Sequence, residues 1–338
     1  MAIRYEVRSA SLIGLVTEVE KLGGDLESLL GEAGLSLDQL GDHDCFIGLD
    51  SVIRVLALAA GRLACPALGM RIAQHQGFFA LGLLGKLVAA EPDLGAAFKA
   101  VQRYLALHNN AEQWRMQVHS GRAYLQRIEQ FYGLPQAQQY RELALATYVR
   151  LAMELGGPDA RPIRVEISHS RIASVKLYQQ YFGCEVLFDR EHDCLVYDEK
   201  VMRYPVRPIP ELAVDQADEY RRARLANLRG SLELQVRSLI AQALGFNQHS
   251  LESVAALMDM HPRTLQRRLR EQGLGFQPLL QEVKMQLACW HLEASAIDLT
   301  LLSHALGYNE LAAFSKAFKN HTGVAPSHWR KQNRQLPG

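Results

Sequence analysis

Cysteine, long apolar runs and net charge are all scarce in this 338-residue chain, and each shortage excludes a class of protein. Its five cysteines are scattered and form no CxxC pair, so neither a zinc cluster nor a disulfide framework is indicated. No run approaches the roughly 18 apolar residues that span a bilayer. The first residues, MAIRYEVRSA, lack the organisation of a signal peptide. We therefore expect a cytoplasmic protein that needs no membrane, metal or cofactor.

The formal net charge of +1 does not by itself indicate a nucleic-acid-binding protein. The distribution of charge is more informative. From Ser231 onward there are 11 Lys and Arg against 8 Asp and Glu, whereas the rest of the chain has a small acidic excess. A local excess of cations fits contact with DNA without proving it.

Apolar spacing predicts an α+β domain over residues 1–206, followed by a linker over 207–231 and an all-α domain over 232–335. The first 110 residues have mainly helical periodicity. Alternating residues then predict a hairpin over 113–119 and 123–129, and a helix at 140–155 precedes a strand at 163–168, a helix at 175–182 and strands at 185–188 and 194–197. Pro205, Pro208 and Pro210, followed by a charged run, mark the start of the linker.

The C-terminal third contains an internal repeat. Eleven residues starting at Ser250 recur in pattern 48 residues later, starting at Asp298. Both residues are good helix N-caps, and each opens a short helix with one apolar face. A turn at Asp259 or Gly307 follows, because both residue types tolerate the left-handed conformation that a sharp turn requires.

Each turn leads into a second helix. In the first copy this helix starts at Pro262 and buries Leu265 and Leu269; in the second copy Phe314 and Phe318 take the equivalent places. Two helices joined by a tight turn form a helix-turn-helix unit, whose second helix enters the major groove of DNA. We therefore predict two such units, at about 250–272 and 298–320, that address successive major grooves of double-stranded promoter DNA.

The outward faces of the two recognition helices supply the candidate DNA contacts. Arg and Gln can bind guanine and adenine edges with two hydrogen bonds each, so the first unit is expected to carry most of the direct readout. The second helix offers mainly apolar contacts and phosphate contacts. The predicted base-reading residues are Arg263, Gln266, Arg267, Leu311, Ala312, Ser315 and Lys316, and the predicted backbone contacts are Ser250, Thr264, Arg270 and Lys319. The alternative is that these residues form the solvated faces of an ordinary helical bundle, which the tandem repeat disfavours.

The segment from about Leu239 to Arg330 resembles the DNA-binding domain of the AraC/XylS family of transcription regulators. The matching stretches are MHPRTLQRRLREQG, KMQLACWHLEA and LLSHALGYNELAAFSKAFKNHTGVAPSHWR. The chain departs from the family pattern at a few positions, where His261 replaces a usual Ser, Asp259 a usual Gly, Ser303 a usual Ala, and Lys284 and Lys316 usual Arg residues. Lys316 offers a point charge instead of a planar fork, which argues against two-bond base contact from the second unit.

Residues of roughly 20–205 resemble the arabinose-binding-like effector domain of one branch of this family. The stretches that carry this resemblance are GLLGKLVAAEPDLGAAFKAVQRYLALHN and the region from RVEISHS to VMRYPV. The resemblance implies an activator that forms a homodimer through this domain, binds a small molecule and contacts RNA polymerase. The effector candidates combine apolar surface with a polar group, as small-molecule sites do: Trp114, Tyr124, Arg127, Phe131, Arg150 and Tyr178.

Two other interpretations remain open at this point. The first keeps the DNA-binding units but makes the N-terminal domain a ligand-free dimerisation or partner-protein platform. The second is an enzyme fused to a DNA reader, which the scattered cysteines and the absence of a GxSxG or phosphate-binding motif disfavour. The trios His43-Asp44-Cys45 and His192-Asp193-Cys194 are expected to be solvated turns rather than metal sites.

Overall fold

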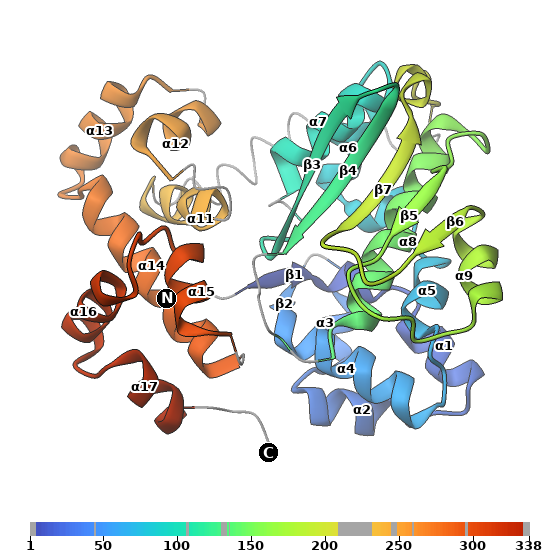
Figure 1. Ribbon diagram of the computed structural model, residues 1–338, viewed down its shortest axis with the longest axis horizontal. Coiled ribbons are helices and arrows are strands. Elements are labelled where there is room, and N and C mark those ends of the chain that lie inside the picture. The colour runs from blue at the N-terminus through green and yellow to red at the C-terminus, as the bar shows by residue number, and fades with distance from the viewer. Residues whose placement is uncertain are drawn as a thin grey trace. The chain divides into compact units, whose positions relative to one another are not determined.

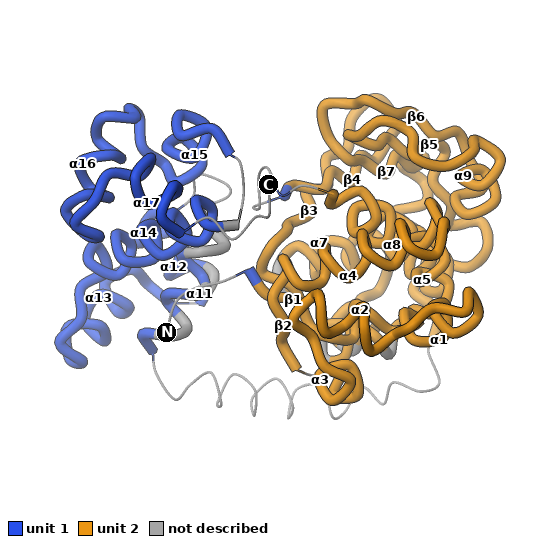
Figure 2. Tube along the Cα trace, turned by 90° about the horizontal axis from the view of Figure 1, so that it is seen from below, with its two compact units in different colours: residues 1–5, 129–135, 219–338 blue, residues 6–128, 136–218 orange. Residues whose placement is uncertain are grey.

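The chain divides into two units in the computed structural model (Figures 1 and 2). We call residues 6–128 with 136–218 the N-terminal unit, and residues 1–5, 129–135 and 219–338 the C-terminal unit. The structure describes residues 5–43, 45–105, 108–129, 134, 136–208, 232–244, 249–258, 260–294 and 297–333. The predicted linker over 207–231 lies almost wholly outside the described residues, and so do Asp44, Phe131 and Asp259.

The N-terminal unit is built around a five-stranded sheet in the order β3-β4-β7-β5-β6. Antiparallel pairing joins β4 to β7 and β7 to β5, whereas β5 and β6 are parallel. A separate antiparallel ribbon pairs β1 with β2. The strands are β1 (Glu6–Arg8), β2 (Phe46–Gly48), β3 (Glu112–His119), β4 (Arg122–Glu129), β5 (Arg164–Glu166), β6 (Glu185–Leu187) and β7 (Asp193–Asp198).

Helix α8 (Gln138–Gly156) organises the N-terminal unit, because it packs against β7 on one side and against α4 and α5 on the other. A helix enclosed in this way is apolar on most of its circumference, which is why buried residues occur all round α8. The remaining helices are η1 (Ser9–Leu12), α1 (Leu15–Lys21), α2 (Leu26–Ala33), α3 (Leu37–Gly41), α4 (Leu49–Arg62), α5 (Leu68–Ala73), η2 (Phe78–Leu81), α6 (Leu83–Ala89), α7 (Leu94–Tyr104), α9 (Val175–Phe182) and η4 (Glu199–Arg203).

The described residues from Leu232 onward form helices, so the predicted fold class is confirmed: a mixed α/β region with a sheet, then an all-helical region. Its helices are α11 (Leu232–Leu244), α12 (Leu251–Leu257), α13 (Pro262–Glu271), α14 (Phe276–Ala294), α15 (Leu299–Ala305), α16 (Leu311–Thr322) and α17 (Pro326–Asn333). The long helix α14 connects two similar groups, one containing α12 and α13 and the other containing α15 and α16 (Figure 1).

One sequence expectation about the N-terminal unit is wrong. The trio His192-Asp193-Cys194 was expected to form a solvated turn, but Asp193 and Cys194 begin β7 and are 3% and 6% exposed. Asp193 is paired in register with Arg127, so the two side chains lie on the same face of the sheet. There it meets Arg127 of the neighbouring strand β4, which compensates the burial of its charge.

Candidate nucleic-acid interface

The two pairs of short helices have the geometry of helix-turn-helix units. Ser250 caps α12 by accepting a hydrogen bond from the Ser253 N–H at 3.1 Å. Asp298 caps α15 by accepting bonds from two backbone N–H groups, which hold the pKa of its carboxyl below the usual range. Gly307 ends the turn after α15 with φ of +71°, a conformation that glycine adopts without strain.

Apolar residues fix each recognition helix to its unit. Leu265 and Leu269 are 0% and 1% exposed and form the inner face of α13. Phe314 and Phe318 are both fully buried on α16, and their rings lie 5.8 Å apart. In each case the buried pair is four residues apart and therefore on one face. The opposite faces of α13 and α16 are left to solvent.

The exposed face of α13 carries the predicted base-reading groups. Arg263, Gln266, Arg267 and Arg270 are all exposed. His261 caps the helix, because its Nδ1 accepts a hydrogen bond from the Arg263 N–H at 3.2 Å. The guanidinium of Arg267 lies 3.1 Å from a carboxylate oxygen of Glu271, one turn further on. Such an exposed ion pair contributes little stability, so Arg267 can exchange it for a base or phosphate at small cost.

The second recognition helix is less polar. Ala312, Lys316 and Lys319 of α16 are exposed, whereas Leu311 and Ser315 are half-buried. Figures 1 and 2 both place α13 and α16 on the same side of the C-terminal unit. An arrangement with two recognition helices on one side is the one needed to enter two successive major grooves on one face of a duplex.

The predicted effector residues that the structure describes do not gather in one cavity. Tyr124 points to the open face of the sheet, where its ring stacks on His119 at 4.3 Å and lines a polar groove of about 430 Å³. Arg150 is exposed on α8 and donates a hydrogen bond to the Gln76 carbonyl. Trp114 is buried and stacks on Tyr148 with 3.8 Å between ring centroids. Phe131 lies outside the described residues.

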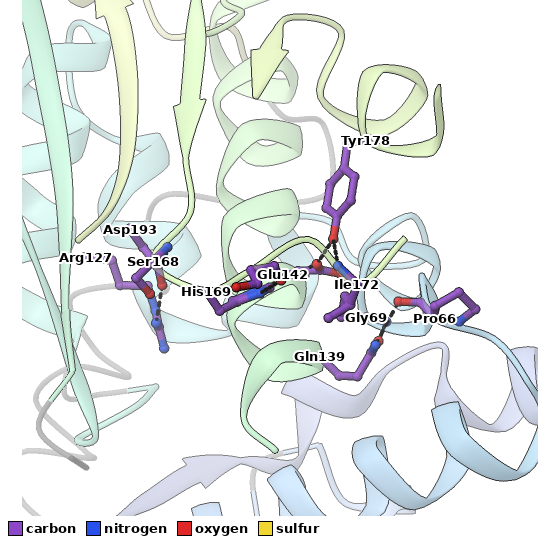
Figure 3. A network of polar contacts seen from close by, with 11 residues as sticks. Pro66, Gly69, Arg127, Gln139, Glu142, Ser168, His169, Ile172, Tyr178 and Asp193 are labelled. Atoms are coloured by element: carbon purple, nitrogen blue, oxygen red, sulfur yellow. Dashed lines mark hydrogen bonds and ion pairs between the residues drawn. The ribbon is translucent and has the colours of Figure 1, made fainter. Parts of the chain in front are cut away.

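Arg127 and Tyr178 belong to a buried polar network between α8, α9 and the sheet (Figure 3). The Arg127 guanidinium binds Glu112 at 2.5 Å and Asp193 at 3.0 Å, so it already has carboxylate partners inside the protein. Although burial alone would raise the pKa of Asp193, the Arg127 charge and the Ser168 N–H hold it below the usual range. Tyr178 donates its hydroxyl hydrogen to Glu142.

Sequence reasoning missed the acids of this network. Glu142 is fully buried, and burial raises its pKa to about 8. His169 lies beside it, with Nε2 at 3.9 Å from Glu142 Oε1. A signal was available in the sequence, since Glu142 lies within the apolar helix predicted at 140–155. A carboxyl group in such a helix is a sign of a buried ionisable group.

A small enclosed cavity of about 20 Å³ lies among η2, α6, α7 and α8. Its lining is apolar and includes Phe78, Leu84, Phe98 and Tyr148. A volume of this size accommodates about one water molecule, so it is not an open metabolite site.

Among the described residues there is also no group of three or more potential metal ligands, and no helix is long and apolar enough to cross a membrane.

Two helix-turn-helix units with exposed basic and amide side chains define a DNA-binding protein. The family described as the arabinose-binding domain of AraC transcription regulators, N-terminal, matches residues 23–206, and a helix-turn-helix domain family matches residues 254–332. This chain therefore belongs to the AraC family of transcription regulators and acts as a DNA-binding regulator rather than an enzyme. The resemblance inferred from the sequence motifs is confirmed.

Two curated regulators and one solved structure are among the proteins similar to this chain. The chain is 27% identical to the HTH-type transcriptional regulator VirS of Mycobacterium tuberculosis over 326 residues, which are 96% of each chain. It is 27% identical to the ornithine utilization regulator of Pseudomonas aeruginosa over 270 residues, 79% of each chain. The crystal structure of the transcriptional regulator CdpR from Pseudomonas aeruginosa covers 93% of this chain and 98% of its own, with 16% identity and a TM-score of 0.44.

Proposed function

We propose that this protein is a one-component transcription activator that reads promoter DNA through α13 and α16 and responds to a small molecule bound by its N-terminal unit. The observation that carries the proposal is the face of α13 opposite Leu265 and Leu269, where Arg263, Gln266 and Arg267 are exposed together. These side chains have the donor and acceptor geometry to distinguish base pairs in the major groove.

The roles of the individual DNA contacts form part of the proposal. Arg263, Gln266 and Arg267 read bases in the first box, and Leu311, Ala312, Ser315 and Lys316 contact the second. Ser250, Thr264, Arg270 and Lys319 bind phosphates and set the register. The protein acts as a homodimer through the N-terminal unit and contacts RNA polymerase, so that each C-terminal unit occupies one promoter half-site.

Binding-site selection from random duplexes, carried out with the full-length protein, tests the DNA-reading role. In the expected product, each half-site has two conserved boxes about one helical turn apart. Recovery of unrelated sequences at physiological salt, with equal weak affinity for all of them, would refute the proposal, since non-specific binding depends mainly on phosphate contacts.

A thermal-shift screen of small metabolites against the full-length protein tests the effector role. A compound that binds the folded N-terminal unit raises the midpoint of its unfolding transition, by an amount that grows with the logarithm of its concentration relative to its Kd. Because one relative is named an ornithine utilization regulator, basic amino acids belong in the first panel. The alternative is an N-terminal unit that serves only as a ligand-free dimerisation or partner-protein platform. That alternative predicts a stable dimer by light scattering and no ligand-dependent shift.

A further inference from the structure

The turn of the second helix-turn-helix unit is held by polar contacts from the connecting helix α14. Lys284 of α14 is only 4% exposed, and its Nζ donates to the Gly307 carbonyl at 3.4 Å. The same ammonium group lies over the Tyr308 ring, 4.7 Å from its centroid. The Tyr308 hydroxyl in turn donates to Gln281 Oε1 at 2.8 Å, about one turn before Lys284 on α14. Both residues of the turn are therefore attached to α14.

His249, at the start of the first helix-turn-helix unit, also packs against the turn at Gly307. This residue directly precedes Ser250, the N-cap of α12. A Cβ atom placed on Gly307 would lie 2.6 Å from Cε1 of His249, so the imidazole packs directly against the backbone of the turn. Burial and the nearby Lys284 charge both lower the pKa of His249. The charge of Lys284 therefore acts on the His249 imidazole. We call His249, Gln281, Lys284, Gly307 and Tyr308 the junction cluster.

The junction cluster therefore joins three parts of the C-terminal unit: the start of the first helix-turn-helix, the connecting helix and the turn of the second. Each recognition helix follows directly from one of these parts, α13 after α12 and α16 after the turn. Apolar packing along α14 is not directional. In contrast, an ammonium group that faces a carbonyl oxygen and a ring has preferred positions, and burial makes misalignment of its charge costly.

This difference matters for DNA affinity. Two linked binding modules gain affinity from their high local concentration, and the gain is lost when their spacing does not fit the two sites. A fixed relation between α13 and α16 makes the protein selective for one spacing between its two DNA boxes. A loose relation would tolerate several spacings and bind each of them more weakly.

We propose that Lys284 is a positioning residue that fixes the spacing between α13 and α16, and thereby the number of base pairs accepted between the two DNA boxes. The proposal rests on the DNA contacts proposed above and adds a determinant that touches no nucleotide.

The test uses the duplex selected by the full-length wild-type protein. Dissociation constants are measured by fluorescence anisotropy for three duplexes: the selected site, the same site with one base pair inserted between the boxes, and the site with its second box scrambled. Wild type is expected to lose about tenfold in affinity upon insertion. Lys284→Met should bind the selected site about tenfold more weakly, bind the one-box duplex like wild type, and lose the insertion penalty. Lys284→Arg, which keeps the charge, should restore the penalty.

Two results overturn the proposal: an unchanged insertion penalty in Lys284→Met, or equal weakening of its affinity for the selected and one-box duplexes. If Lys284→Met does not fold, as judged by its thermal transition, Lys284→Gln carries the test. This variant keeps a polar side chain and removes the charge that faces the Gly307 carbonyl and the Tyr308 ring, so it should reduce the insertion penalty without changing one-box affinity, and an unchanged penalty refutes the proposal. If wild type selects no two-box sequence, the proposed function itself is refuted. If wild type selects one and Lys284→Met behaves like wild type, only the role of Lys284 is refuted.

Discussion

The hydroxyl group of Tyr178 on α9 donates a hydrogen bond to Oε1 of Glu142 on α8, and both side chains are fully buried (Figure 3). The second oxygen, Oε2, has no hydrogen-bond partner among the described residues. Burial of a carboxyl group favours its neutral form. This is why the pKa of Glu142 is raised from 4.5 to about 8.

The Glu142→Gln substitution should flatten the pH dependence of stability. In the unfolded chain Glu142 loses its proton near 4.5, whereas the folded protein keeps it until about pH 8. The unfolded state binds fewer protons across this window, so the free energy of unfolding falls as pH rises, by up to about 1.4 kcal/mol per pH unit. Calorimetry at the two ends of the window should show the variant gaining stability relative to wild type at the higher pH. Glu154→Gln, at an exposed carboxyl on the same helix, is the control. A stability difference between Glu142→Gln and wild type that does not change with pH would contradict this prediction.

Arg127→Met should destabilise the N-terminal unit strongly. The guanidinium is 0% exposed and neutralises Glu112 and Asp193, which are themselves 4% and 3% exposed. Removing one member of such a buried group leaves uncompensated charge and costs about 3–5 kcal/mol. Chemical denaturation measures the loss. In a triple variant that also carries Glu112→Gln and Asp193→Asn, part of the stability should return. If Arg127→Met loses less than about 1 kcal/mol in the free energy of unfolding, the prediction is contradicted. The carboxylates of Glu112 and Asp193 would then be in contact with water rather than in a low-dielectric core.

Arg267→Ala and Gln266→Ala should relax sequence preference within the first DNA box. Both side chains are exposed on α13, and the ion pair between Arg267 and Glu271 is too weak to withhold the guanidinium from a base. Each variant is expected to lose about 1–3 kcal/mol of discrimination at one base pair. Arg268→Ala is the matched control for Arg267→Ala, because it removes the same charge from an exposed position of α13 that is not among the proposed DNA contacts. If selection with Arg267→Ala and Gln266→Ala recovers the wild-type base preferences, neither residue reads a base.

Lys316→Ala should weaken DNA binding evenly across sequences. Lys316 is exposed on α16, and its ammonium group is a point charge suited to phosphate. The slope of log affinity against log salt concentration should fall by about 1 on its removal. Titrations at several salt concentrations with specific and unrelated duplexes measure both effects. A changed preference at one base pair with an unchanged slope would instead assign Lys316 to base readout.

Much of the fold was predictable because its elements have local signals. Alternation predicted the hairpin of β3 and β4, and helical periodicity predicted α8 and both helix-turn-helix units. The ribbon of β1 and β2 was not predicted, since each strand has three residues and the two pair across residues 9–45, which contain η1, α1, α2 and α3. Helical periodicity over the first 110 residues also did not predict the break between η2 and α6 at Gly82, where φ is +54°.

The DNA-reading face and the effector candidates differ in how far sequence could predict their arrangement. The exposed face of α13 follows from Leu265 and Leu269 alone, because one helix fixes which residues oppose a buried pair. Residues of an effector site come from several strands and helices, and their convergence depends on register. Arg127 and Tyr124 illustrate this, since they lie on opposite faces of β4.

Ser303→Ala should stabilise the C-terminal unit. Ser303 on α15 is fully buried, and its hydroxyl has no hydrogen-bond partner among the described residues. An unsatisfied buried hydroxyl costs about 1–3 kcal/mol, and alanine removes it while leaving the helix intact. Ser250→Ala provides a contrast with the same chemical change. Its hydroxyl caps α12 through the Ser253 N–H, so this variant should lose about 1 kcal/mol. Thermal and denaturant unfolding of the two full-length variants should therefore shift in opposite directions. If Ser303→Ala unfolds at lower temperature than wild type, the hydroxyl is hydrogen-bonded in solution and the buried face of α15 contains a polar contact.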